Sequence, residues 1–115
     1  MYVRTIKITF KDSMSKDMFV NYTDTKADAQ GIGNGTLMKF IMSNSDITAT
    51  LILIFPDYDI FKRDDENLAG PIIQSMRNQD LKVELHQGEI AGATAVSTKF
   101  FKFLEKEANF YASKE

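Results

Sequence analysis

The sequence predicts an α+β protein with a ferredoxin-like βαββαβ core and an extra C-terminal helix. Three observations carry this prediction: the order of the strand and helix patterns, a short polar turn between the two middle strands, and a length of 115 residues, typical of one ordinary domain. We expect a single domain over 1–115, with a core over 1–95 and a helix over 96–115. The four strands should form one antiparallel sheet with both crossover helices on the same face.

Residues 2–10 alternate between apolar and polar side chains, which indicates a half-buried strand. Ile6, Ile8 and Phe10 point to one face, and we expect that face to contact the helices.

A helix is predicted over 13–30. Asp12 and Ser13 are suitable N-caps, and the glycine-rich stretch "GIGNG" supplies the stop. Met14, Met18 and Tyr22 recur near helical spacing, together with Phe19 and Ala29, so this stripe is expected to face the core. The methionines at 14, 18, 38 and 42 are interpreted as packing residues rather than metal ligands.

The segments "TLMKFIM" and "ITATLILIF" predict two strands, and the polar turn "SNSD" joins them into a hairpin. Pro56 ends the second strand because it has no N–H to donate. In that strand Leu51, Leu53 and Phe55 belong to one face and Ile52 and Ile54 to the other, with Leu37 and Ile41 expected beside the latter pair.

The second half of the core is predicted to hold a helix over 70–79 and a strand that begins at 81. Pro71 suits the first turn of the helix, and a short helical turn over 58–63 is possible before it. In "LKVELHQGEI", Leu81, Val83 and Leu85 alternate with polar residues. The terminal "STKFFKFLEKEANFYASKE" has a serine cap and an aromatic stripe, so it predicts the C-terminal helix.

Composition excludes several functions. There is no cysteine, so disulfides, thiolate metal sites and cysteine nucleophiles are ruled out, and a net charge of -2 without a basic stripe argues against nucleic acid or anionic membranes. No segment is long and apolar enough for a membrane span, so we expect a cytoplasmic protein. The acids of "DYDIFKRDDE" lack the glycine of a calcium loop, and no metal is expected.

The apolar side chains on both faces of "TLILIF" predict a partner. A single layer of helices covers only one face, and fully burying an isoleucine is worth about 1.5–3 kcal/mol. The cover could be the C-terminal helix or a second copy of the chain, and we favour a homodimer.

The strand end "LILIFPD", with the element order and length, resembles the dimeric α+β barrel superfamily, whose best-known branch is the antibiotic-biosynthesis-monooxygenase-like domains. The resemblance spans about residues 1–95. It implies two protomers that join their sheets into one barrel, with small ligands bound between sheet and helices. Haem-degrading members use a helical histidine with an asparagine and a tryptophan. This chain has no tryptophan and its single histidine falls in a strand, so no cofactor is expected.

Candidate functional residues come from the polar side chains that the predicted sheet gathers on the face away from the helices. His86 is the candidate general base, since its unperturbed pKa lies near 6.5. The candidate ligand-binding residues are Thr5, Lys7, Thr50 and Glu84.

Two functions stay open on this evidence. One is a cofactor-independent oxygenase- or isomerase-like enzyme that acts on a small apolar ring compound in a sheet–helix pocket, with His86 as base. The other is a non-catalytic homodimeric module that binds a small ligand or serves as a scaffold, in which Lys7, Glu84 and His86 form only a solvated charge patch. A cavity that contains His86 would favour the enzyme.

Overall fold

The computed structural model describes residues 1–23, 35–94, 98–99 and 102. Over these ranges the chain has the predicted ferredoxin-like α+β fold. The elements are, in order, β1 (Tyr2–Thr9), α1 (Ser13–Tyr22), β2 (Met38–Ser43), β3 (Thr48–Phe55), α3 (Tyr58–Asp64), the π-helix η2 (Asp65–Ala69), α4 (Gly70–Asn78) and β4 (Lys82–Glu89).

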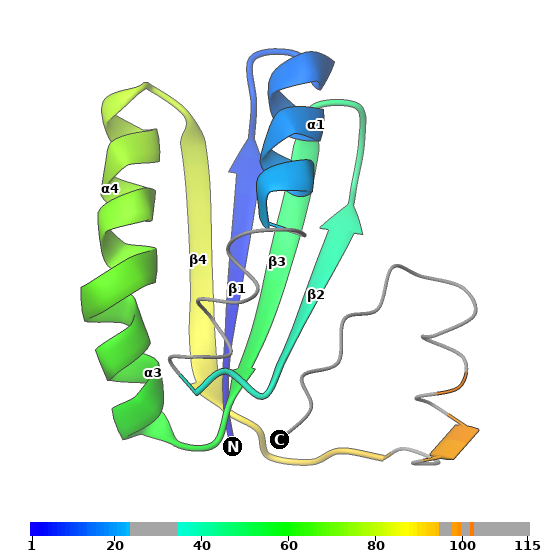
Figure 1. Cartoon of the computed structure of the whole chain (residues 1–115), viewed down its shortest axis with the longest axis vertical. Helices are drawn as coiled ribbons and strands as arrows, with labels where there is room; N and C mark the ends of the chain where they lie inside the picture. Colours follow the sequence, from blue (N-terminus) through cyan, green and yellow to red (C-terminus); the bar gives the residue numbers. More distant parts are fainter. Residues whose placement is uncertain (24–34, 95–97, 100–101, 103–115) are drawn as a thin grey trace.

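The four strands form one antiparallel sheet in the order β2-β3-β1-β4. Helix α1 and the column made by α3, η2 and α4 lie on the same face of this sheet (Figure 1). We call this side the helix face and the other side the open face.

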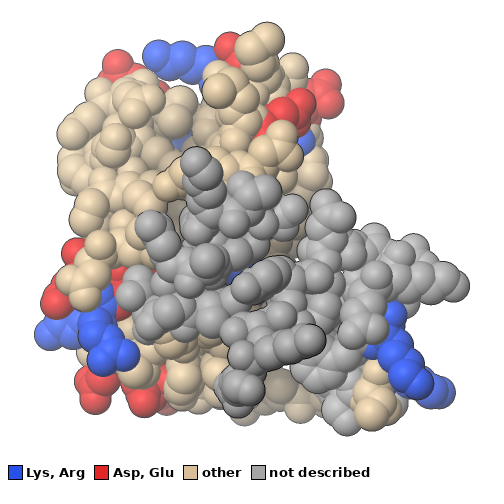
Figure 2. All heavy atoms as spheres, in the orientation of Figure 1, with Lys and Arg blue, Asp and Glu red and all other residues tan. Residues whose placement is uncertain are grey.

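The core lies between the helix face and the two helical segments. On the sheet side Ile6, Ile8 and Leu51 are buried, and Ile73 and Met76 of α4 pack against them. Side chains alternate along a strand, so every second residue of β1 faces this core. In Figure 2, charged side chains of both signs are visible at the top and at the lower left of the described surface.

Among the described residues, the buried stripe of helix α1 shares Phe19 with the predicted stripe but not its methionines. Met14 and Met18 are 72% and 66% exposed, so their predicted place in the core is wrong. The buried positions are Lys16 and Thr23, with Phe19 between them packed against the core. These three also recur at helical spacing, and the Lys16 ammonium donates to the hydroxyl of Ser43 in β2. The sequence analysis missed this stripe because a lysine at a core-facing position interrupts its apolar pattern.

The two faces of strand β2 are exchanged relative to the prediction. Ile41 pairs with Leu51 on the helix face, and not with Ile52 and Ile54. Met38 and Phe40 pair with Ile54 and Ile52, so they join the open face. Met42 follows them there and is 46% exposed, which corrects its predicted place in the core. A shift of one residue exchanges the two faces of a strand.

The acidic stretch after Pro56 forms helix. Asp57 caps α3 by accepting from the N–H of Ile60, and the helical backbone continues through η2 into α4. Pro71 lacks an N–H, and its ring would clash with the carbonyl four residues before it in a regular α-helix. The wider turn η2 accommodates it, and Gly70 donates to the carbonyl of Asp65, five residues back. The predicted helix over 70–79 is therefore the second part of a longer helical column.

Within the described residues, the predicted helix over 13–30 corresponds to α1 and the π-helical Thr23 that follows it, and its positions 24–30 lie outside the described residues. The predicted C-terminal helix over 96–115 also lies outside them, apart from Thr98, Lys99 and Lys102. None of the helices in the described ranges combines the length and apolarity needed to cross a bilayer.

Candidate functional site

The five predicted site residues lie together on the open face. His86 pairs with Thr5 across β4 and β1, and Glu84 pairs with Lys7 on the next rung of the same face. Lys7 pairs in turn with Thr50 of β3. The five side chains therefore occupy two neighbouring rungs of three adjacent strands.

The surroundings of this polar group are half apolar. Thr5 pairs with Ile52 on its other side, and Ile52 pairs with Phe40. His86 and Lys7 are exposed, while Thr5 is half-buried. Glu84 accepts an ion pair from Lys82 at 3.5 Å along its own strand. A histidine beside a threonine hydroxyl and apolar side chains can act as a base once the face is covered.

His86 cannot line a pocket between the sheet and the helices of its own protomer. Its pairing partner Thr5 alternates with Arg4 and Ile6, both of which are buried on the helix face. The prediction combined a pocket between sheet and helices with His86 as its base. Within one protomer these two features lie on opposite faces of the sheet, so the combination is wrong. Any pocket that contains His86 must be closed by something on the open face.

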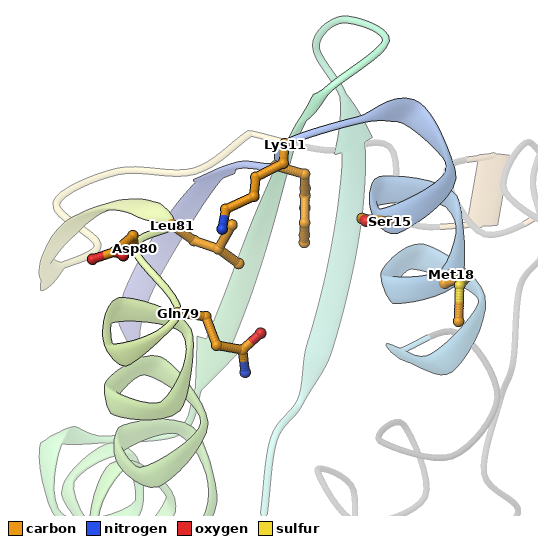
Figure 3. A pocket seen from close by; sticks show the side chains of 7 residues that line it. Lys11, Ser15, Met18, Gln79, Asp80 and Leu81 are labelled. Atoms are coloured by element: carbon orange, nitrogen blue, oxygen red, sulfur yellow. The ribbon is translucent and has the colours of Figure 1, made fainter.

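A cleft of about 550 Å³ opens on the helix face, between α1 and the C-terminal end of α4 (Figure 3). Its size falls within the roughly 300–1,000 Å³ of small-molecule sites. The lining mixes apolar and polar side chains from both helical segments and the adjoining strand ends: Phe10, Lys11, Ser15, Met18, Gln79, Asp80 and Leu81.

The turn from α4 into β4 shapes one side of this cleft. Asp80 adopts a φ of 63°, a left-handed conformation that aspartate tolerates better than most residues. The N–H of Leu81 donates to the carbonyl of Met76, which fixes the turn against the end of the helix. The sequence pattern missed the cleft because its residues come from two stretches, 10–18 and 79–81, that are far apart in the chain.

A row of residues crosses the helix face beside the apolar core, and most of its side chains are polar. Arg4 pairs with Gln87 on one side and Leu53 on the other, and Leu53 pairs with Lys39. The ammonium of Lys39 donates to the backbone carbonyl of Thr23, at the C-terminus of α1, where a cation is favoured by the helix dipole. The row thus places two cations, Arg4 and Lys39, between the sheet and the helices.

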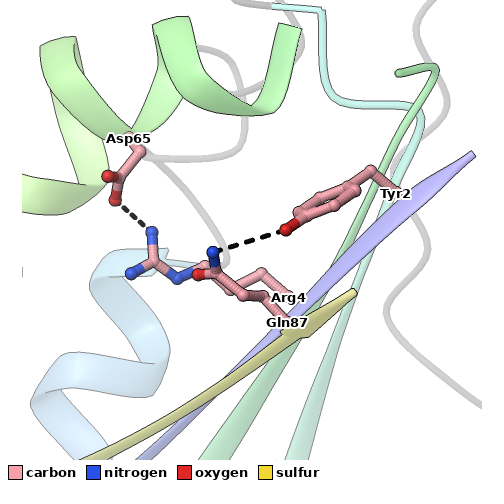
Figure 4. A network of polar contacts seen from close by, with 4 residues as sticks. All are labelled: Tyr2, Arg4, Asp65 and Gln87. Carbon is pink, nitrogen blue, oxygen red and sulfur yellow. Dashed lines mark hydrogen bonds and ion pairs between the residues drawn. The ribbon is translucent and has the colours of Figure 1, made fainter. Parts of the chain in front are cut away.

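Arg4 is the most buried cation of the row, at 5% exposure. Its Nη1 donates to the carboxylate of Asp65 in η2, and nearby Gln87 donates to the hydroxyl of Tyr2 at 3.3 Å (Figure 4). The sequence contained a signal for this residue, because Arg4 is in phase with Ile6 and Ile8. A charge at a core-facing strand position requires a partner.

The fold and these sites define a small α+β protein with a ferredoxin-like sheet. Its helix face carries a cleft and a row with a buried arginine, and its open face carries both polar and apolar side chains. No family model matches the chain, and no curated protein matches it.

Solved structures do share its fold. One is a proposed antibiotic biosynthesis monooxygenase from Deinococcus radiodurans, with a TM-score of 0.67 and 8% identity over 84% of this chain and 98% of that one. A dimeric ferredoxin-like protein from an uncultured marine organism has a TM-score of 0.57 and 8% identity over 83% and 99%. A variant of SnoaB, a cofactor-independent oxygenase from Streptomyces nogalater, has 0.56 and 13% over 84% and 96%. These likenesses confirm the fold that the sequence resemblance implied.

Proposed function

We propose that the protein is a homodimer in which two copies pack face to face through their open faces. The apolar side chains of this face support the proposal: Phe40, Ile52 and Ile54 lie side by side and remain only half-buried in one copy. Covering such a patch is favourable in proportion to the apolar area removed from water. The solved structures of the same fold include one described as dimeric.

Within that dimer we propose a cofactor-independent enzyme, oxygenase- or isomerase-like, that acts on a small apolar ring compound. The observation that carries the proposal is the rung formed by His86, Thr5 and Ile52, which sets the only imidazole of the chain against an apolar floor. In a covered chamber His86 would take a proton from a ring hydroxyl and leave an electron-rich anion for reaction with oxygen. Lys7 beside it would stabilise that anion.

SnoaB, the cofactor-independent oxygenase whose solved structure has the same fold, supports this class of reaction. Thr50 and Glu84 complete the proposed ligand-binding group with Thr5 and Lys7. Their hydroxyl and carboxylate groups would orient polar substituents of the ring.

The second candidate is a non-catalytic ligand-binding homodimer. It is favoured by the position of the cleft between α1 and α4, which lies on the opposite face of the sheet from His86. A ligand in that cleft would contact Met18 and Leu81 and would be out of reach of the imidazole.

One experiment separates the two candidates. A panel of quinol-like and other aromatic compounds is screened by thermal shift, since a ligand at 100 times its dissociation constant stabilises the folded state by about 2.7 kcal/mol. Any compound that binds is then tested with His86→Ala and with Met18→Lys. We expect His86→Ala to abolish oxygen uptake and Met18→Lys to leave it unchanged. Loss of binding in Met18→Lys alone, without oxygen uptake by the wild type, would establish the non-catalytic candidate instead.

A further inference from the structure

Arg4 is a buried guanidinium whose hydrogen-bonding capacity is only partly used. Its Nη1 is held by Asp65, and its Cζ lies 5.2 Å from the ring centroid of Phe61, within cation–π range. The Nε of the same side chain is buried and has no hydrogen-bond partner among the described residues. A buried donor without an acceptor costs about 1–3 kcal/mol, and more when the group is charged.

Aromatic side chains connect this guanidinium to the surface. Phe61 is buried beneath Arg4, and its ring contacts Tyr58 at 5.9 Å between centroids. Tyr2 contacts both rings, at 4.7 Å from Phe61 and 5.3 Å from Tyr58. Tyr58 is 50% exposed, so this cluster of packed aromatic rings extends from the surface to the ring beneath the buried charge.

We propose that this site binds the carboxylate of a flat aromatic acid. The carboxylate accepts a charge-assisted hydrogen bond from Nε of Arg4, and the ring of the acid stacks against Tyr58 and Tyr2. The carboxylate of Asp65 on the other side of the guanidinium would repel a dianion such as phosphate, which favours a group with a single negative charge.

This site is separate from the cleft between α1 and α4, and it does not depend on the proposed catalytic role of His86. Arg4 lies in β1 and Phe10 directly follows this strand, six residues further on, which at about 3.3 Å per residue places them about 20 Å from each other. His86 lies on the opposite face of the sheet.

The test compares naphthoate with its neutral amide, naphthamide, by titration calorimetry of the full-length protein at neutral pH. The two compounds have nearly the same shape, so their affinity ratio reports the charge alone. We expect naphthoate to bind the wild type about tenfold more tightly, a difference of about 1.4 kcal/mol. Arg4→Met should remove this preference. Arg77→Met deletes an exposed positive charge of α4 and should keep it.

Asp65→Asn provides a test with the opposite sign. It removes the competing negative charge while retaining the shape of the side chain, so naphthoate should bind severalfold more tightly than to the wild type. Thermal melts confirm that each variant is folded. If Arg4→Met does not fold, Arg4→Lys and Asp65→Asn still decide the outcome, because lysine keeps the charge but lacks Nε and should lose most of the preference.

Three results would overturn the proposal. These are equal affinity of the wild type for the acid and the amide, an unchanged preference in Arg4→Met, and weaker naphthoate binding in Asp65→Asn. Absence of naphthoate binding at millimolar concentration would overturn it as well.

Discussion

The backbone N–H of Gly70 donates to the carbonyl of Asp65, and this bond closes the π turn that directs Asp65 toward Arg4. Gly70 lies close to Asp65: a Cβ added to Gly70 would lie 2.5 Å from the carbonyl oxygen of Asp65. The turn that accommodates Pro71 therefore also determines where the partner of a buried charge is placed.

Gly70→Ala should destabilise the protein. The added methyl group cannot fit against a backbone oxygen without moving the helical column, and overpacking of this kind costs about 1–3 kcal/mol. Urea unfolding followed by circular dichroism measures the change. Gly88→Ala is the matched control, because a Cβ at that position meets no atom within 4 Å. Equal stability of the two variants would show that the π turn does not require glycine.

Ile52→Lys should dissociate the proposed dimer. It introduces a charge into the middle of the open face, where each copy would bury it without a partner. We expect the dissociation constant to rise about a hundredfold or more, equivalent to about 2.7 kcal/mol. Sedimentation equilibrium measures it, and Met14→Lys on the exposed side of α1 should remain dimeric. A monomeric wild type at high micromolar concentration would remove the dimer from the proposed function.

Ser43→Ala should lower the free energy of unfolding by about 0.5–1.5 kcal/mol, because Ser43 is exposed and water can reach the contact. The change leaves the ammonium of the buried Lys16 without the hydroxyl that accepts its hydrogen bond. Lys16→Met combined with Ser43→Ala removes both polar groups and should recover most of the loss. Urea titration of the two single variants and the double variant gives the coupling energy. Additive effects of the two changes would exclude this contact as a link between α1 and β2.

The cap of α1 should make stability depend on pH. The N–H of Ser15, and then its hydroxyl, lowers the pKa of the Asp12 carboxyl below its ordinary value by hydrogen bonding to the ionised form. The lower pKa belongs to the folded state, so the contribution is complete above the unfolded pKa of about 4 and is lost as pH falls through the folded pKa. Asp12→Ser keeps a cap that does not titrate. The melting temperature of the wild type should therefore fall more steeply than that of Asp12→Ser below about pH 4. Parallel curves would contradict this role.

Short-range patterns predicted a large part of the fold. Alternation in β1 and β4, the polar turn of the hairpin and the position of Pro56 gave the strands and their order, and Asp12 gave the start of α1. The same two-residue period also placed Thr5, Lys7, Thr50, Glu84 and His86 on one face, since alternate residues of a strand share a face. Their chemical role remains a proposal.

Other features depended on partners far away in the sequence. The sequence by itself determined the period of each element, because the geometry of a helix or a strand is local. Only the tertiary structure decided which stripe of α1 is buried, which face of β2 meets the core, and how Arg4 is accommodated. Each of these is settled by a contact between distant residues, such as Lys16 with Ser43 or Arg4 with Asp65. Burial of a charge is favourable only when such a partner is present, and a local pattern does not contain that information.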